Sequence, residues 1–242
     1  ADEPLAKGSV ADYFRACSYG NFMPRFDVVA KVTLKNGYKH YGAHQGSLND
    51  AHVTDLVKEA VEQACAQGVD FAPYAVDGRA PIVSIIHAGP GEHEDYGDDC
   101  DDYVWAHFRP MTIPADGVSF ASYIINNETL RYFKGGVVEK EPMTGIGTFC
   151  HEFGHALGLP DMYDTNGEYD GKADTPGYWD IMDYQFMYDG YRPTSYSAYE
   201  RSMLGWLQIK PLKENGAYTL MPLDGTATEG SVQAACVVNP QN

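Results

Sequence analysis

The sequence His151-Glu152-Phe153-Gly154-His155-Ala156-Leu157-Gly158-Leu159-Pro160-Asp161 contains two histidines four positions apart, followed by a glycine and an aspartate. Residues four apart lie on one face of an α-helix, so the imidazoles of His151 and His155 point the same way. Zinc binds neutral imidazole nitrogens, and an open zinc site combines three protein ligands with a water. Gly158 can end the helix in a left-handed cap, after which the chain can bring Asp161 back as an oxygen ligand. The stretch therefore predicts a zinc site.

The glutamate between the two histidines has a role of its own in this pattern. Glu152 can take a proton from a water held at the site. The alternative interpretation is a structural helix with two packed histidines. Three glycines, at positions 145, 147 and 154, argue against it, since each costs about 1 kcal/mol relative to alanine in a helix interior. The first two lie near the helix start and cost less, but a helix kept only for packing would rarely contain so many.

Composition excludes several classes of function. The chain has 242 residues, 44% of them hydrophobic, and a net charge of −17. These values fit one globular domain, alone or with an appendage. The negative charge argues against nucleic acid and anionic membranes as partners, and no apolar run reaches the roughly 20 residues of a membrane helix. The chain begins at Ala1 within polar sequence, so we expect that a leader has been removed.

Carboxylates are concentrated in one irregular segment. Between residues 92 and 102, seven of eleven side chains are Asp or Glu, and they repel one another unless something compensates their charge. Calcium, which takes six to eight oxygen ligands, could do so. The candidate ligands are Asp98, Asp99, Asp101 and Asp102. A solvated acidic loop is the other interpretation.

Hydrophobic periodicity predicts an α+β fold. Helical spacing is clear in residues 10–17 and again in residues 50–68, where six apolar side chains share one face. Alternating or continuous apolar runs predict strands at residues 25–34, 82–87 and 118–125, with a hairpin turn at Asn36-Gly37 after the first. Together with the motif helix, for which Thr144 is a candidate cap, these elements predict a sheet backed by long helices.

Three stretches carry a family resemblance. They are His151–Asp164 (H-E-F-G-H-A-L-G-L-P-D-M-Y-D), Tyr178–Met182 (Y-W-D-I-M) and Ser197–Trp206 (S-A-Y-E-R-S-M-L-G-W). Over roughly residues 10 to 210 the chain resembles immune inhibitor A-type metallopeptidases, which are secreted bacterial zinc enzymes. The resemblance implies a metzincin-like fold with a mixed, twisted sheet. Residues 1–210 would form the catalytic domain, and residues 211–242 a β-rich tail or the start of a truncated β module.

The resemblance also implies roles for two residues after the zinc motif. Metzincins follow that motif with a tight turn that holds a methionine below the metal, and Met182 matches this position. In several metzincins a tyrosine two residues later reaches the metal or the developing oxyanion, and Tyr184 matches it. The third ligand has a competitor, because a different zinc-peptidase arrangement uses a glutamate on a later helix. Glu200 could serve in that way, although Ser197 and Glu200 also form the spacing of a capping box.

The function implied is that of a secreted zinc endopeptidase acting on protein or peptide substrates. In this mechanism Glu152 activates a zinc-bound water, and Tyr184 stabilises the oxyanion. The alternative is a catalytically inactive, zinc-peptidase-like binding module. Glu152 argues against that alternative, since an inactive site needs no base. We expect a monomer.

Overall fold

The computed structural model describes residues 8–46, 49–165, 175–183, 190–224 and 232–237. Its helices are α1 (Val10–Cys17), α2 (Tyr38–Gly42), α3 (Val53–Ala66), α4 (Gly147–Ala156) and α6 (Ala198–Met203), with short 3-10 turns η1 (Ala72–Tyr74), η2 (Glu92–Glu94), η3 (Cys100–Asp102) and η4 (Gly177–Trp179). Its strands are β1 (Arg79–Ala80), β2 (Val83–Pro90), β3 (His107–Ala115), β4 (Val118–Thr129), β5 (Tyr132–Lys134), β6 (Val137–Lys140), β7 (Lys210–Leu212) and β8 (Ala235–Val237). Within the described ranges no helix is long and apolar enough to cross a membrane.

The main sheet is mixed and is built around β4. Strands β1 and β2 pair with β4 in parallel, with Val83 opposite Tyr123. Strand β3 pairs with β4 in the antiparallel direction, with Phe108 opposite Ile124. The mixed sheet agrees with the predicted α+β class. Strand β3 was not predicted, and it contains Pro110 and Pro114, which suit an edge strand because proline cannot donate to a ladder.

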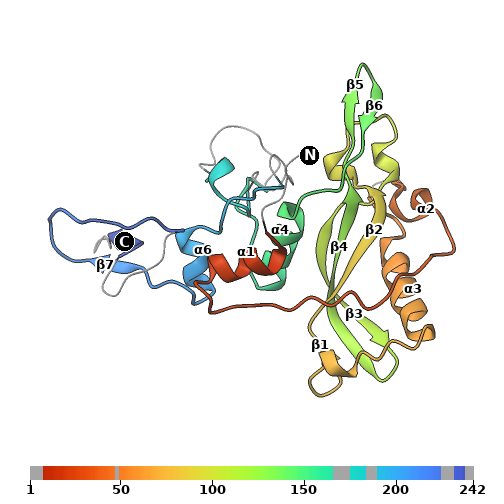
Figure 1. Cartoon of the computed structure of the whole chain (residues 1–242), viewed down its shortest axis with the longest axis horizontal. Helices are drawn as coiled ribbons and strands as arrows, with labels where there is room; N and C mark the ends of the chain where they lie inside the picture. The colour runs from red at the N-terminus through yellow and green to blue at the C-terminus, as the bar shows by residue number, and fades with distance from the viewer. Residues whose placement is uncertain (1–7, 47–48, 166–174, 184–189, 225–231, 238–242) are drawn as a thin grey trace.

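Helices cover both faces of this sheet (Figure 1). Helix α3 packs on one face and buries all six apolar residues predicted for it: Val53, Leu56, Val57, Ala60, Val61 and Ala64. It begins after His52, slightly later than the predicted residue 50, and it ends before Gly68, whose φ is +84°. Helix α4 packs on the other face, where Ile124 of β4 meets Phe153 and Met182. The sheet therefore separates the motif helix from α3. Helix α3 has 14 residues and α4 has 10.

Residues 25–34 are not a strand, in contrast to the prediction. Val28 is 98% exposed, whereas Val32 and Leu34 pack against the core around α3. Nor does Asn36-Gly37 form a hairpin, because α2 follows at once. The buried Tyr41 explains this local choice. Its hydroxyl donates to Glu59 Oε2 of α3 at 2.8 Å and accepts from the Asn36 N–H, which anchors a helical turn here.

The C-terminal part extends away from the sheet (Figure 1). Strands β7 and β8 pair in parallel, whereas residues 213–224 between them contain no strand. Arg201 of α6 is fully buried and ties this part to the body of the protein. It donates to the Leu223 carbonyl at 3.2 Å and forms an ion pair with Asp224, while the Tyr19 hydroxyl also donates to Leu223.

Candidate metal centre

Helix α4 carries the motif and is held tightly by its neighbours. A Cβ atom placed on Gly154 would lie 2.7 Å from Met182 Sδ and 2.9 Å from the Tyr196 hydroxyl, so only glycine permits this approach. The helix begins at Gly147 without a side-chain cap. The predicted cap, Thr144, instead donates its hydroxyl to Glu94 Oε2 at 2.7 Å.

The end of α4 brings the third predicted ligand back to the two histidines. Gly158 adopts a φ of +101°, which supplies the left-handed stop. Beyond it, the Met162 N–H donates to the Met182 carbonyl at 2.8 Å and fixes the returning chain. As a result, Asp161 Oδ1 lies 3.3 Å from His151 Nε2 and 3.1 Å from His155 Nε2. Zinc ligands about 2.1 Å from the ion in a tetrahedron lie about 3.4 Å apart, so the spacing suits zinc.

Backbone carbonyls fix which nitrogen of each imidazole faces this point. Nδ1 of His151 lies 2.9 Å from the Ile181 carbonyl, and Nδ1 of His155 lies 2.8 Å from the Leu159 carbonyl. A carbonyl only accepts, so each Nδ1 carries the hydrogen and each Nε2 presents a lone pair. Among the described residues, the buried Asp161 Oδ1 has no hydrogen-bond partner. Three converging lone pairs suit a cation, and two imidazoles with one carboxylate are a donor set that zinc accepts.

Protons compete with a metal ion for the donor atoms of His151, His155 and Asp161. Burial alone would raise the pKa of Asp161, but contact with the two imidazoles outweighs it and holds that pKa well below its usual range. Burial would lower the pKa of His155, but its contacts with Asp161 and the Leu159 carbonyl raise it overall. A metal would have to displace such protons, so metal affinity should fall in acid.

Glu152 lies beside the candidate metal ligands, on the same helix as the two histidines. It is buried, and Oε1 is 4.0 Å from His151 Nε2. The backbone N–H of Phe108 donates to Oε2 at 2.7 Å, which orients the carboxylate. Burial raises the pKa of Glu152 to about 7, with the two imidazoles and the Phe108 N–H opposing the rise. A group with a pKa near neutrality can both accept and release a proton at physiological pH.

A tight turn at residues 180–183 supports the centre. Asp180 Oδ1 accepts from the Met182 N–H at 2.9 Å, and the Asp183 N–H donates to the Asp180 carbonyl. Met182 is fully buried against Gly154, and the neighbouring Ile181 carbonyl is the group that orients His151. Tyr184, the predicted oxyanion donor, lies outside the described residues.

Glu200 is not part of the donor group. Its carboxylate accepts from the Ser197 N–H at 2.7 Å and from the Ser197 hydroxyl at 2.9 Å, which is the capping box. Burial, and next the charge of Asp180, raise the pKa of Glu200 to about 8. In the described part of the chain, the residue whose donor atom converges with those of His151 and His155 is Asp161. The alternative of Glu200 as a ligand therefore receives no support.

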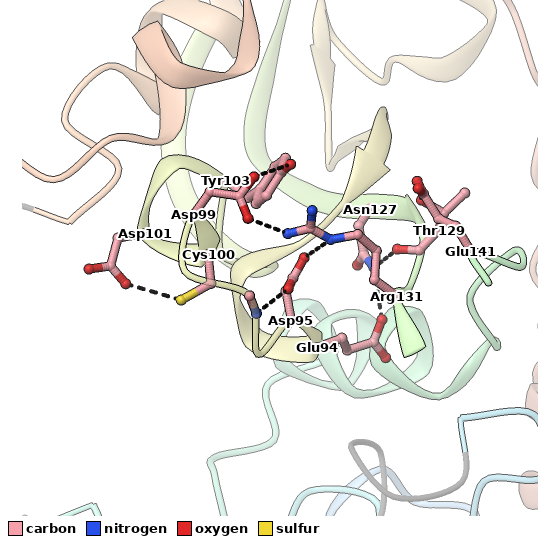
Figure 2. A network of polar contacts seen from close by, with 11 residues as sticks. Glu94, Asp95, Asp99, Cys100, Asp101, Tyr103, Asn127, Thr129, Arg131 and Glu141 are labelled. Atoms are coloured by element: carbon pink, nitrogen blue, oxygen red, sulfur yellow. Dashed lines mark hydrogen bonds and ion pairs between the residues drawn. The ribbon is translucent and has the colours of Figure 1, made fainter. Parts of the chain in front are cut away.

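Cationic side chains of the protein itself compensate part of the charge of the acidic segment, and Figure 2 shows Arg131 in this role. Arg131 forms ion pairs with Asp95 and Asp99, the latter at 2.7 Å, and Lys39 pairs with Asp102. Of the four predicted calcium ligands, only Asp101 belongs to a converging donor group in the described ranges, and Asp98 is exposed. The calcium prediction receives no support, because Arg131 and Lys39 supply compensation that spacing alone does not reveal.

The functional groups missed by sequence reasoning are backbone groups. They are the Phe108 N–H and the carbonyls of Leu159 and Ile181. Every residue has such groups, so only the location of β3 and of the turn could have indicated them. Strand β3 was hidden by its two prolines.

Comparison with known proteins gives consistent results. The model of the family described as "Immune inhibitor A peptidase M6, catalytic domain" matches residues 5–210. Immune inhibitor A of Bacillus thuringiensis subsp. alesti is 29% identical over 232 residues, which cover 81% of this chain and 32% of that protein. Pre-pro-metalloprotease PrtV of Vibrio cholerae serotype O1 (strain M66-2) is 26% identical over 198 residues, covering 70% of this chain and 20% of that protein. The chain thus spans a third or less of the length of these relatives.

Proposed function

The chain belongs to the immune inhibitor A family of M6 peptidases, and on that premise we propose that it is a zinc-dependent endopeptidase. The observation that carries the proposal is the convergence of His151 Nε2, His155 Nε2 and Asp161 Oδ1 beside the buried Glu152. These three residues would hold the ion. When bound, zinc would supply Lewis-acid activation of water and of the scissile carbonyl.

The chain's own residues would handle the proton. Glu152 Oε1, on the side of the carboxylate that faces His151, would take a proton from the attacking water and pass it to the leaving amine. The Phe108 N–H, bound to Oε2, would keep the carboxylate oriented in both steps. Tyr184 is proposed as the donor to the oxyanion, a contact that strengthens as charge develops.

A supporting part is proposed for the turn that follows. Met182 corresponds to the methionine of a metzincin Met-turn, because it packs against Gly154 of the motif helix. The adjacent Ile181 carbonyl would preserve the tautomer of His151 during turnover. In this account the turn acts through packing and orientation and takes no part in bond breaking.

The wider setting is proposed from the family. Substrates would be proteins or peptides, the enzyme would act after secretion, and it would work as a monomer. The catalytic unit is proposed to span residues 1–210, with residues 211–242 as an appended tail. The name of the Vibrio relative, a metalloprotease, is consistent with this setting.

Cleavage of an unfolded protein substrate tests the proposal. The chain is stripped of metal with a chelator, assayed, and assayed again after one equivalent of zinc is added. We expect cleavage to disappear with the chelator and to return with zinc. If the folded, zinc-loaded chain cleaves nothing, the proposal fails and the inactive binding module is the better account.

A further inference from the structure

A second group of metal-binding side chains lies outside the centre described above. It consists of His44, which follows α2, Glu92 of η2 and Asp101 of η3. One donor atom from each lies within 4.8 Å of the other two, and His44 Nε2 is 3.2 Å from Glu92 Oε2. The segment after α2 and two turns of the acidic segment therefore direct an imidazole and two carboxylates to one point.

Contacts that do not involve the donor atoms hold these segments together. A Cβ atom on Gly42 would lie 2.5 Å from the Tyr103 carbonyl carbon, so α2 touches the backbone next to η3 directly. The rings of Tyr38 and Tyr103 stack at 4.6 Å with 12° between their planes. The Glu92 N–H donates to the Val104 carbonyl at 3.2 Å. The donors are thus preorganised by the fold around them.

Apart from His44 itself, which lies 3.2 Å from Glu92, the described residues place no cationic side chain against the carboxylates at this point. Asp50 is buried nearby, where its two oxygens accept from the Trp105 N–H at 3.2 and 3.3 Å. Burial raises the pKa of Asp50 to about 7, and the charge of Glu92 adds to the rise. In the part of the chain that the structure describes, no lysine or arginine forms an ion pair with Asp50, Glu92 or Asp101, since Lys39 is bound to Asp102. A divalent cation would supply the missing charge.

We propose that His44, Glu92 and Asp101 form a second site, for a divalent transition-metal ion of the zinc class. The imidazole decides the class, because calcium takes oxygen ligands and imidazole suits zinc, copper or nickel. Ligands about 2.1 Å from an ion lie at most about 4.2 Å apart. Asp101 is exposed, so rotation of its side chain can close the site around the ion. The thiol of Cys100 donates to Asp101 Oδ1 at 3.3 Å and so helps to orient that carboxylate (Figure 2).

This ion would have a structural role. It would join the segment after α2 to η2 and η3. Glu92 and Asp101 would then be fixed by the ion, whereas Arg131 holds Asp95 and Asp99, which lie between them in the sequence. The site shares no residue with the His151 centre, so its existence does not depend on the proposed peptidase activity.

Zinc binding by the full chain tests the proposal. We expect the metal-stripped chain to bind two equivalents of Zn²⁺ by calorimetry, and His44→Gln to bind one. His155→Gln should also bind one equivalent, and the double variant none. His40→Gln is the matched control, because His40 stacks on His52 and belongs to no donor group in the described ranges, and it should retain two.

The outcomes separate the two sites. One equivalent in the unaltered chain that persists in His44→Gln and vanishes in His155→Gln would overturn the second site and leave the first intact. If His44→Gln does not fold, Asp101→Asn, a change of an exposed side chain, takes its place. Zn²⁺ should raise the melting temperature of His155→Gln but not that of the double variant. A rise produced by Ca²⁺ and not by Zn²⁺ would contradict the proposed class of ion.

Discussion

Gly154 of the motif helix and Met182 of the following turn are in direct contact, with only 2.7 Å between Met182 Sδ and the place where a Cβ atom on Gly154 would lie. This contact joins the two parts of the centre. On one side of it are His151 and His155, and on the other is the Ile181 carbonyl that orients His151. The glycine therefore costs helix stability in exchange for a close fit at the centre.

Gly154→Ala should destabilise the protein. The new methyl group would meet both Met182 Sδ and the Tyr196 hydroxyl, which donates to the Cys150 carbonyl at 2.7 Å and cannot retreat without losing that bond. Overpacking costs about 1–3 kcal/mol, and the gain in helix propensity offsets about 1 kcal/mol of it. Urea unfolding should show a net loss. Gly37→Ala, with open space around it, should change the midpoint little. Equal midpoints for both variants would refute the packing argument.

Met182→Leu should retain activity and zinc content while losing roughly 1 kcal/mol of stability or less, as similar-sized apolar exchanges do. Met182 is fully buried and acts through its packing against Gly154. The measurement combines urea unfolding, zinc analysis and cleavage rate on one preparation. Complete loss of cleavage with unchanged zinc content would mean that the methionine does more than pack.

Glu200→Gln should leave zinc content unchanged and alter the pH dependence of stability. The pKa of Glu200 is about 8 in the folded protein against 4.5 unfolded, because of burial and then of Asp180. The folded state thus keeps a proton that the unfolded state releases. The free energy of unfolding therefore decreases as the pH rises from about 4.5 to about 8, and the contribution of the protonated Glu200 is lost above that range. Glutamine can still cap but does not ionise.

At pH 8.5 the Glu200→Gln variant should therefore be more stable than the unaltered chain, by on the order of 1–3 kcal/mol, with the difference vanishing near pH 5. Urea midpoints across this range measure it. Asp161→Asn provides the contrast, since it should lose zinc. Zinc loss in Glu200→Gln with retention in Asp161→Asn would reverse the assignment of the third ligand.

Arg131→Ala should cost about 3–5 kcal/mol of stability, because it leaves the fully buried Asp95 carboxylate without its partner. Lys134→Ala removes a cation from an exposed pair with Glu139 and should cost less than about 1 kcal/mol. Stability of the unaltered chain should not change when calcium is chelated. If Arg131→Ala leaves the stability unchanged and a calcium chelator destabilises the unaltered chain, calcium and not Arg131 provides the compensating charge.

The sequence predicted elements whose signal is local. Helix α3 is indicated by six apolar residues on one face, and the capping box of α6 is indicated by the spacing of Ser197 and Glu200. The convergence of the candidate metal ligands was predictable for the same reason, because His151, Gly158 and Asp161 lie within one helix and its stop. Buried β4 was equally visible as an apolar run, although it extends to Thr129, beyond the predicted end.

What the sequence concealed depends on partners distant along the chain. Residues 25–34 have strand-like alternation, but within the described residues no strand pairs with them, and they are irregular. Strand β3 exists because β4 offers it an edge, despite its prolines. The acidic segment looked like a calcium loop because Arg131, which follows it by about thirty positions, gives no sign in the sequence that it folds back onto Asp95. Tertiary contacts decide all three.

The most direct test of the central claim is the cleavage rate of zinc-loaded Glu152→Gln on an unfolded protein. Glutamine keeps the shape of the side chain and can still accept from the Phe108 N–H, but it cannot take a proton from water. We predict full zinc content and a rate at least about 100-fold lower, the usual contribution of general acid–base catalysis. A variant that binds zinc and cleaves at the unaltered rate would contradict the account.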